Sequence, residues 1–226
     1  MASTTNSQEI QVDQATAVIT GQRSLQSWPV LLLVFVAGAA SLSIEMAASR
    51  LLAPYFGDSL FVWSSIIGLI LLYLTVGYYV GGQLSDRYPR PIFLYGITAA
   101  ASILIALIPL IALPLMTWAQ VAFSNDAYGV LYGSLLSMLT FFALPTILLG
   151  CVSPFAIRIR MQQVGSAGRV AGILYAISTA GSILGTFLPV LVLLPYLGTM
   201  QTFLVTALVL FIFSVAGYLL TKKADQ

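Results

Sequence analysis

Two ionisable side chains lie inside a stretch that is apolar enough to span a bilayer. Glu45 and Arg50 fall in the second half of residues 28–55, WPVLLLVFVAGAASLSIEMAASRLLAPY. An ionisable residue at the centre of a spanning helix costs about 2.5–3.5 kcal/mol on insertion scales, so it is a candidate functional residue. A carboxylate in such surroundings can bind an amine or carry a proton. Glu45 is therefore interpreted as a cation or proton site, or else as a structural clamp to another helix.

The neighbours of Glu45 on its own helix face are serines. Ser41 and Ser49 lie four residues to either side, and residues four apart share a helix face. We expect this polar face to point into a helix bundle. Arg50 is rotated by about 140° from Glu45 on an ideal helix and can extend toward the membrane surface. Hydroxyls elsewhere in the chain are candidate partners for Glu45: Tyr73, Thr75, Tyr175, Ser178 and Thr179.

The composition places the chain in the membrane class. Of its 226 residues, 59% are hydrophobic and 7% are charged, against about 25% charged in soluble domains. There is no histidine, and Cys151 is the single cysteine. This excludes internal disulfides, cysteine-rich metal sites and His-based acid–base chemistry. We therefore predict no catalytic residue, no metal site, no cofactor and no nucleic-acid partner.

Six apolar segments meet the length of about 20 residues that a spanning helix requires. The sequence predicts an all-α, polytopic six-helix bundle at 28–221, after a polar tail at 1–27 and before a short tail at 222–226. Prolines in the third and fourth segments predict tilted or kinked helices. The six segments are 28–52, 60–82, 91–117, 130–157, 168–193 and 199–221.

The distribution of basic residues predicts the orientation. With six spans, every Lys and Arg except Arg50 falls on one side of the membrane, and Asp58 lies on the other. Loops rich in Lys and Arg stay in the cytoplasm, so both termini are expected there.

A short segment after the second span carries a further signature. Gly82, Asp86, Arg87 and Arg90 resemble the motif of the major facilitator superfamily between its second and third helices, although Pro89 replaces an expected glycine. That resemblance implies a loop that closes the cytoplasmic gate. The alternative is an ordinary basic cytoplasmic loop.

A second basic segment separates the fourth and fifth spans. Arg158, Arg160 and Arg169 are interpreted as a loop that docks a soluble partner or anionic lipid headgroups. The alternative is that these arginines only fix the orientation.

A closer resemblance covers most of residues 43–198. EMAASRLLAPYFG at 45–57, GCVSP at 150–154 and GRVAGILYA at 168–176 resemble the membrane portion of the bacterial fused transporter/spermidine synthase family. The resemblance implies half of a major facilitator fold in the bacterial inner membrane. It places Glu45, Arg50, Asp86, Arg87 and Arg169 at motif positions. The family's aminopropyltransferase portion has no counterpart here, so no enzymatic activity is expected.

Three functions remain open from the sequence. The first is a transport module for a polyamine or other cationic metabolite, in which Glu45, Arg50, Ser41, Ser49, Tyr175 and Thr179 form the site and a homodimer encloses the path. The second is a non-catalytic membrane anchor for a separate spermidine-synthase-like enzyme. The third is a structural subunit of a larger membrane complex.

Overall fold

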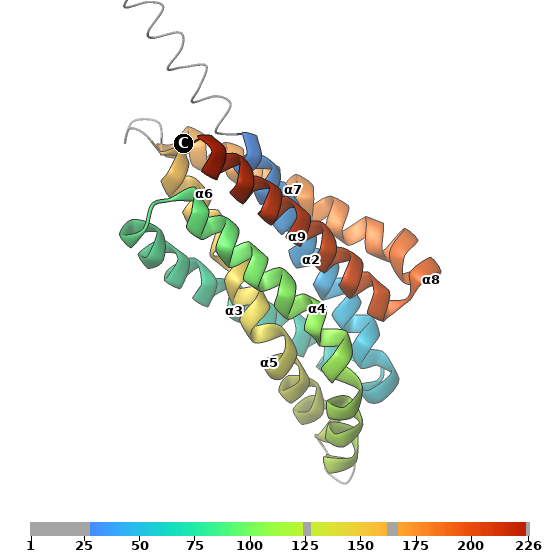
Figure 1. Ribbon diagram of the computed structural model, residues 1–226. Coiled ribbons are helices and arrows are strands. Elements are labelled where there is room, and N and C mark those ends of the chain that lie inside the picture. The colour runs from blue at the N-terminus through green and yellow to red at the C-terminus, as the bar shows by residue number, and fades with distance from the viewer. Residues whose placement is uncertain (1–27, 124–127, 162–166, 225–226) are drawn as a thin grey trace, which may run out of the picture.

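The computed structural model describes residues 28–123, 128–161 and 167–224, and all of its regular elements are helices (Figure 1). Six helical segments are long and apolar enough to cross a membrane, as the sequence predicts. Two of the six are interrupted and carry more than one label. The elements are α2 (Trp28–Phe56), α3 (Leu60–Arg87), α4 (Pro91–Ala122), α5 (Gly129–Gly150), α6 (Val152–Arg160), α7 (Ala167–Leu188), η2 (Pro189–Leu193), α8 (Leu194–Leu197) and α9 (Thr199–Ala224).

The helices extend further than the apolar segments that predicted them. The second span was predicted to end near residue 82, and the helix that contains it, α3, continues to Arg87. The last helix likewise reaches Ala224, beyond the predicted end at 221. Apolarity marks the part of a helix inside hydrocarbon, whereas backbone hydrogen bonding continues into the polar boundary. The predicted tail at 1–27 lies outside the described residues.

Two of the six spans are interrupted. The fourth breaks at Cys151, because Pro154 has no N–H to donate to the carbonyl of Gly150 and its ring crowds that carbonyl. The fifth passes into a π-helical segment that starts at Pro189. By contrast, the helices run on through Pro109, Pro114 and Pro145.

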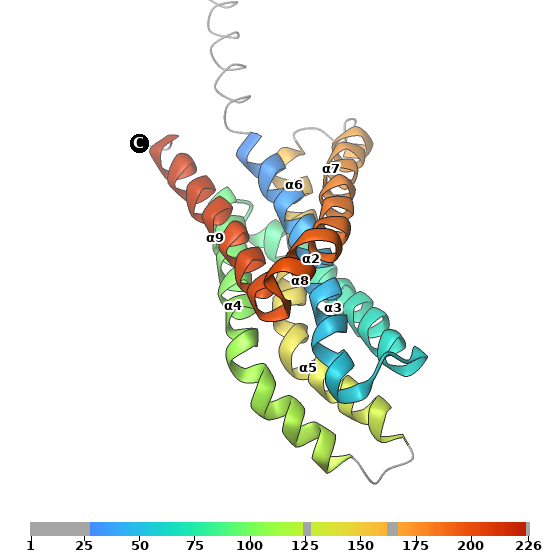
Figure 2. The same ribbon diagram turned by 90° about the vertical axis from the view of Figure 1, so that its right-hand side faces the viewer.

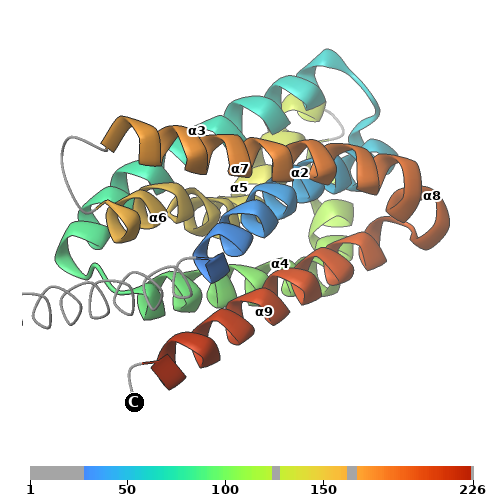
Figure 3. The ribbon, with the colours of Figure 1, turned by 90° about the horizontal axis from the view of Figure 1, so that it is seen from above.

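The helices pack in pairs through glycines. The α2 helix lies along α7, α3 along α5, and α4 along α9, and from above α2 lies between α7 and α9 (Figure 3). A Cβ on Gly181 or Gly185 would overlap the backbone of Phe35 or Ala39 on α2. Such close backbone approach is the usual basis of helix association in lipid, where the hydrophobic effect does not separate helix from tail.

The same arrangement recurs between α3 and the fourth span. Gly77 packs against the backbone of Ile147, and Gly81 against Cys151. These contacts repeat the pattern of Gly181 on Phe35 and Gly185 on Ala39, with the same four-residue steps. The first span therefore corresponds to the fourth and the second to the fifth. Alternate spans run in opposite directions, so this correspondence is inverted. Together with α4 and α9, which pack along each other, it divides the bundle into two inverted units of three spans each, α2–α4 and α5–α9.

Hydroxyl groups join the packed pairs inside the bundle. Ser43 Oγ donates to the carbonyl of Gly185 at 3.2 Å, which ties α2 to α7. Ser214 donates to Thr98 at 2.8 Å between α9 and α4. Ser65 and Ser134 lie 3.0 Å apart between α3 and α5. Each of these hydroxyls is thereby hydrogen-bonded, so none is left as an unpaired polar group in the apolar interior.

The two ends of the bundle differ in charge. The first residue of α2 and the last turn of α9 lie at the same end (Figure 1). That end, called here the basic end, also holds Arg87, Arg158 and the lysines of α9. At the opposite end, called here the far end, the α4–α5 hairpin projects beyond α8 and α9 (Figure 2).

Candidate functional site

A cavity of about 120 Å³ lies where the two inverted units meet. Five elements contribute to its wall, namely α2, α3, α5, α6 and α7. The interruption at Cys151 adjoins the cavity, because Leu149, Val152 and Ser153 on either side of the break all line it. Irregular backbone inside a membrane is tolerated where it lines such a cavity.

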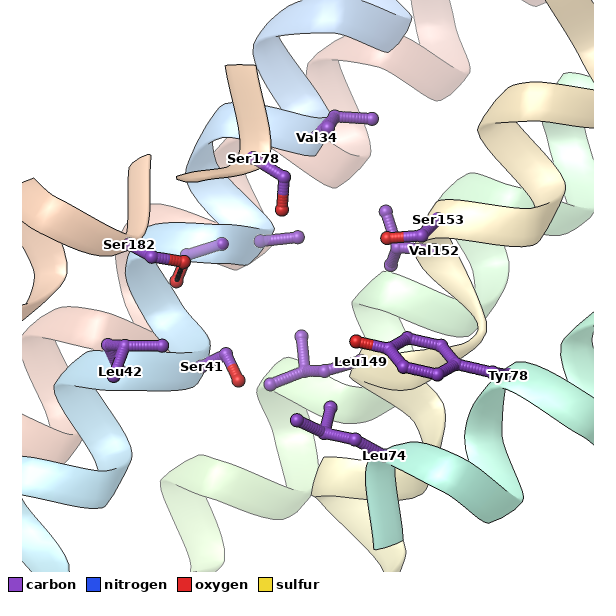
Figure 4. A pocket seen from close by; sticks show the side chains of 12 residues that line it. Val34, Ser41, Leu42, Leu74, Tyr78, Leu149, Val152, Ser153, Ser178 and Ser182 are labelled. Atoms are coloured by element: carbon purple, nitrogen blue, oxygen red, sulfur yellow. Dashed lines mark hydrogen bonds between the residues drawn. The ribbon is translucent and has the colours of Figure 1, made fainter. Parts of the chain in front are cut away.

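Uncharged hydroxyls supply the polar part of the wall. Ser41, Tyr78 and Ser153 approach the space from three different helices, and Ser178 faces them from α7 (Figure 4). Ser182 also lines the cavity but donates to the carbonyl of Gly38 at 3.2 Å. A hydroxyl can both donate and accept, so this wall suits a small ligand with several polar atoms.

The wall follows the inverted repeat. Ser41 on α2 corresponds to Ser153 on α6, since each lies three residues after a close-packed glycine, Gly38 and Gly150. Tyr78 and Ser182 correspond in the same way, each directly after a close-packed glycine. The cavity therefore lies on the pseudo-two-fold axis between the units, where the binding sites of inverted-repeat transporters are found.

The structure separates the residues that were predicted to act with Glu45. Ser41 lines the cavity, whereas Glu45 is half-buried one turn further along α2 and does not line it. Within the described part of the chain, Glu45 makes no hydrogen bond or ion pair. Ser49 donates to its own helix at the carbonyl of Met46, 2.8 Å away. Arg50 is exposed near the far end.

Tyr175 and Thr179 also lie apart from the cavity. Both are exposed on α7, and the neighbouring Ser178 lines the wall instead. Sequence reasoning missed Tyr78, Ser153 and Ser182. A search for the internal repeat would have found Tyr78 and Ser182, because each follows the first glycine of a GxxxG pair.

The two basic segments of the sequence meet at one point. Arg158 Nε on α6 lies 3.0 Å from Asp86 Oδ1 on α3. The N–H of Arg158 is not aligned as a hydrogen bond, so the contact is one between charges. Gly82, Asp86 and Arg87 belong to the last turns of α3, which corrects the predicted gate loop for these three residues. Arg90 precedes α4 as its N-cap.

The predicted docking loop is similarly shortened. Arg158 and Arg160 are in the last turn of α6, and Arg169 is in the first turn of α7. Only residues 161–166 separate these helices, and 162–166 lie outside the described residues. The arginines are therefore fixed to helix ends at the basic end.

No protein-family model, curated protein or solved structure matches the chain. The function is therefore inferred from the positions and chemistry of the residues. In the described ranges, no group of three or more His, Cys, Asp or Glu side chains gathers that could hold a metal ion.

The ion pair at the basic end gives a first prediction. Asp86→Asn should lower the free energy of unfolding by less than about 1 kcal/mol, because exposed pairs contribute 0–1 kcal/mol. The side chains of Arg158 and Asp86 are 41% and 73% exposed. Thermal unfolding in detergent at low and high salt measures this. A loss of several kcal/mol would show that the pair is shielded from solvent, contrary to our expectation.

Proposed function

We propose that the chain is a membrane transport module that binds a small polar solute in the cavity between its inverted units. The observation that carries the proposal is the ring of hydroxyls from four elements, α2, α3, α6 and α7, at the pseudo-two-fold axis. A site at such an axis is reached equally from either side when the two units rock against each other. The proposal assigns no catalytic activity to the chain and places it in the bacterial cytoplasmic membrane.

Glu45 favours a cationic solute, such as a polyamine. Its carboxylate lies one turn from Ser41 on the same face of α2, and no described residue neutralises it. An uncompensated acid within a spanning helix attracts a cation that enters the adjoining cavity. An amino group near Glu45 would leave the rest of the ligand within reach of the hydroxyl wall.

The pair between Asp86 and Arg158 supports a closed exit at the basic end. It joins α3 to α6, and both helices line the cavity further toward the bundle centre. The resemblance to the facilitator superfamily assigns the segment around Asp86 to a gate. In this proposal the cavity opens toward the basic end when the pair separates.

Uptake of a labelled polyamine by proteoliposomes tests the role of Glu45. We expect Glu45→Gln to reduce uptake by about tenfold or more, which corresponds to about 1.4 kcal/mol. The matched control is Asp58→Asn, another acid-to-amide change, at an exposed residue that bonds to Trp63 Nε1 at 2.7 Å. If Glu45→Gln transports every cation tested at the wild-type rate, the carboxylate is not part of the site.

The alternative function is a non-catalytic membrane anchor for a soluble spermidine-synthase-like enzyme. The arginines at the ends of α3, α6 and α7 favour it, because they offer a basic surface to an acidic partner. Purification from native membranes separates the two functions. An anchor would bring a soluble enzyme with it and show no uptake.

A further inference from the structure

The cavity is incomplete on one side. Tyr78 lines it and yet is 48% exposed. The helices on either side of this opening are α3 and α7, which do not pack along each other. Within one copy of the chain, the wall of the cavity is therefore missing between α3 and α7.

Small and hydroxyl-bearing residues, with one leucine among them, border the opening on both helices. They recur in alternating steps of four and three residues, the spacing of helices that pack side by side over a long distance. All of them are exposed or half-buried. We call these two rows the α3 seam and the α7 seam. The α3 seam is Ser64, Gly68, Leu71, Thr75, Tyr78 and Gly82, and the α7 seam is Gly168, Gly172, Tyr175, Thr179, Ser182 and Thr186.

The glycines of the seams lack the neighbours that most other helical glycines have. A Cβ on Gly68, Gly82, Gly168 or Gly172 would meet open space, whereas one on Gly181 would overlap a neighbouring backbone. Glycine weakens a helix by about 1 kcal/mol relative to alanine, so four unpacked glycines need another explanation. A second helix that approaches closely would provide it.

Most of the remaining exposed surface of α3 and α7 has a different character, with Tyr79 on α3 as an exception. Beside the seams, large apolar residues such as Val76 and Val80 on α3 and Leu184 and Phe187 on α7 are exposed, as expected against lipid tails. Each seam exposes one phenolic group, that of Tyr78 or Tyr175, and neither makes a hydrogen bond within the described ranges. An unpaired hydroxyl in hydrocarbon is costly, so the seams are poorly suited to lipid.

We propose that a second copy of the chain covers the opening, with the α3 seam of each copy against the α7 seam of the other. The two seams correspond residue by residue in the inverted repeat, and α3 and α7 run in opposite directions. A two-fold axis along the membrane normal therefore sets each seam against its counterpart, in the manner of an isologous interface. Thr75 and Thr179 adjoin the cavity-lining Leu74 and Ser178, so they lie at the same level.

Neither seam carries a charged residue, so no like charges oppose the contact. The second copy closes the cavity wall beside Tyr78 and brings acceptors to the exposed tyrosines. The pairing does not depend on transport, although an enclosed path through the proposed module requires it.

Disulfide crosslinking between two differently tagged chains tests the pairing. Because Cys151 is the only cysteine, Cys151→Ala gives a cysteine-free background. In that background, chains with Thr75→Cys and chains with Thr179→Cys are co-expressed and oxidised in native membranes. We expect an adduct that carries both tags, at least tenfold more abundant than with either of two control pairs. The controls combine Thr75→Cys with Leu139→Cys on α5 or Leu208→Cys on α9, which are 55% and 57% exposed away from the seams.

Gly172→Leu provides a second measurement. It fills the open space at the α7 seam, so it should convert a two-copy particle in detergent to a single copy with an unchanged Tm. The proposal is overturned if no doubly tagged adduct forms, if the control pairs crosslink equally, or if an adduct forms only with a different membrane protein. Failure of polyamine uptake together with the expected adduct would overturn transport and leave the pairing standing.

Discussion

Replacing Ser41 and Ser153 together with leucine should reduce uptake in proteoliposomes by more than tenfold. Both residues line a cavity of only about 120 Å³, from corresponding positions on α2 and α6. Each leucine removes a group that can donate and accept, worth about 0.5–1.5 kcal/mol per hydrogen bond. It also fills space that a solute would occupy. The two losses act at one site, so we expect the double variant to lose essentially all uptake.

The control for this experiment is Thr140→Leu. Thr140 is exposed on α5, lies outside the cavity and both seams, and bonds to the carbonyl of Leu136 at 2.8 Å. This variant should transport normally. A wild-type rate for the Ser41 and Ser153 double variant, with an unchanged Tm, would mean that the solute does not pass through this cavity.

The second large effect concerns stability. Gly181→Ala should lower the free energy of unfolding by about 1–3 kcal/mol, the usual cost of overpacking. The new Cβ would overlap the carbonyl oxygen of Phe35, which is backbone and cannot rotate away. Gly77→Ala should cost a similar amount, because Gly77 meets the carbonyl of Ile147 in the corresponding place. Thermal unfolding of the purified protein in detergent measures both.

Gly96→Ala is the matched control for these glycine substitutions. Gly96 is exposed on α4, and a Cβ there meets nothing within 4 Å. Alanine is the better helix former by about 0.8–1.0 kcal/mol, so this variant should be slightly more stable than the wild type. Equal stability losses at Gly96 and Gly181 would contradict the close approach of α7 to α2.

Sequence patterns did not predict most of the residues that line the cavity. The predicted spans identified the correct helices. Ser41, predicted as a site residue, and Ser178, predicted as a partner of Glu45, both line the cavity. Tyr175 and Thr179 were placed on the right helix but on the wrong face. The reason is that α7 is apolar or small on every side, so periodicity did not separate the face toward α2 from the face toward the α7 seam.

The contact between Asp86 and Arg158 was not predicted for a related reason. They are far apart in the chain, and no local pattern reports that α3 and α6 end side by side. Pairing of helices in lipid depends on which glycines meet which backbone atoms, as with Gly81 and Cys151. That is a property of complementary surfaces rather than of either segment alone.

By itself, the sequence determined the six apolar spans, the gathering of basic residues at one end, and the presence of an acid within the first span. These follow from composition and length, because the cost of exposing polar groups to hydrocarbon acts on each segment independently. Only the tertiary structure decided that the hydroxyls of Ser41, Tyr78, Ser153 and Ser178 surround one cavity and that Glu45 lies beside it. Those relations arise from contacts between helices, which depend on the exact positions of small residues on several segments at once.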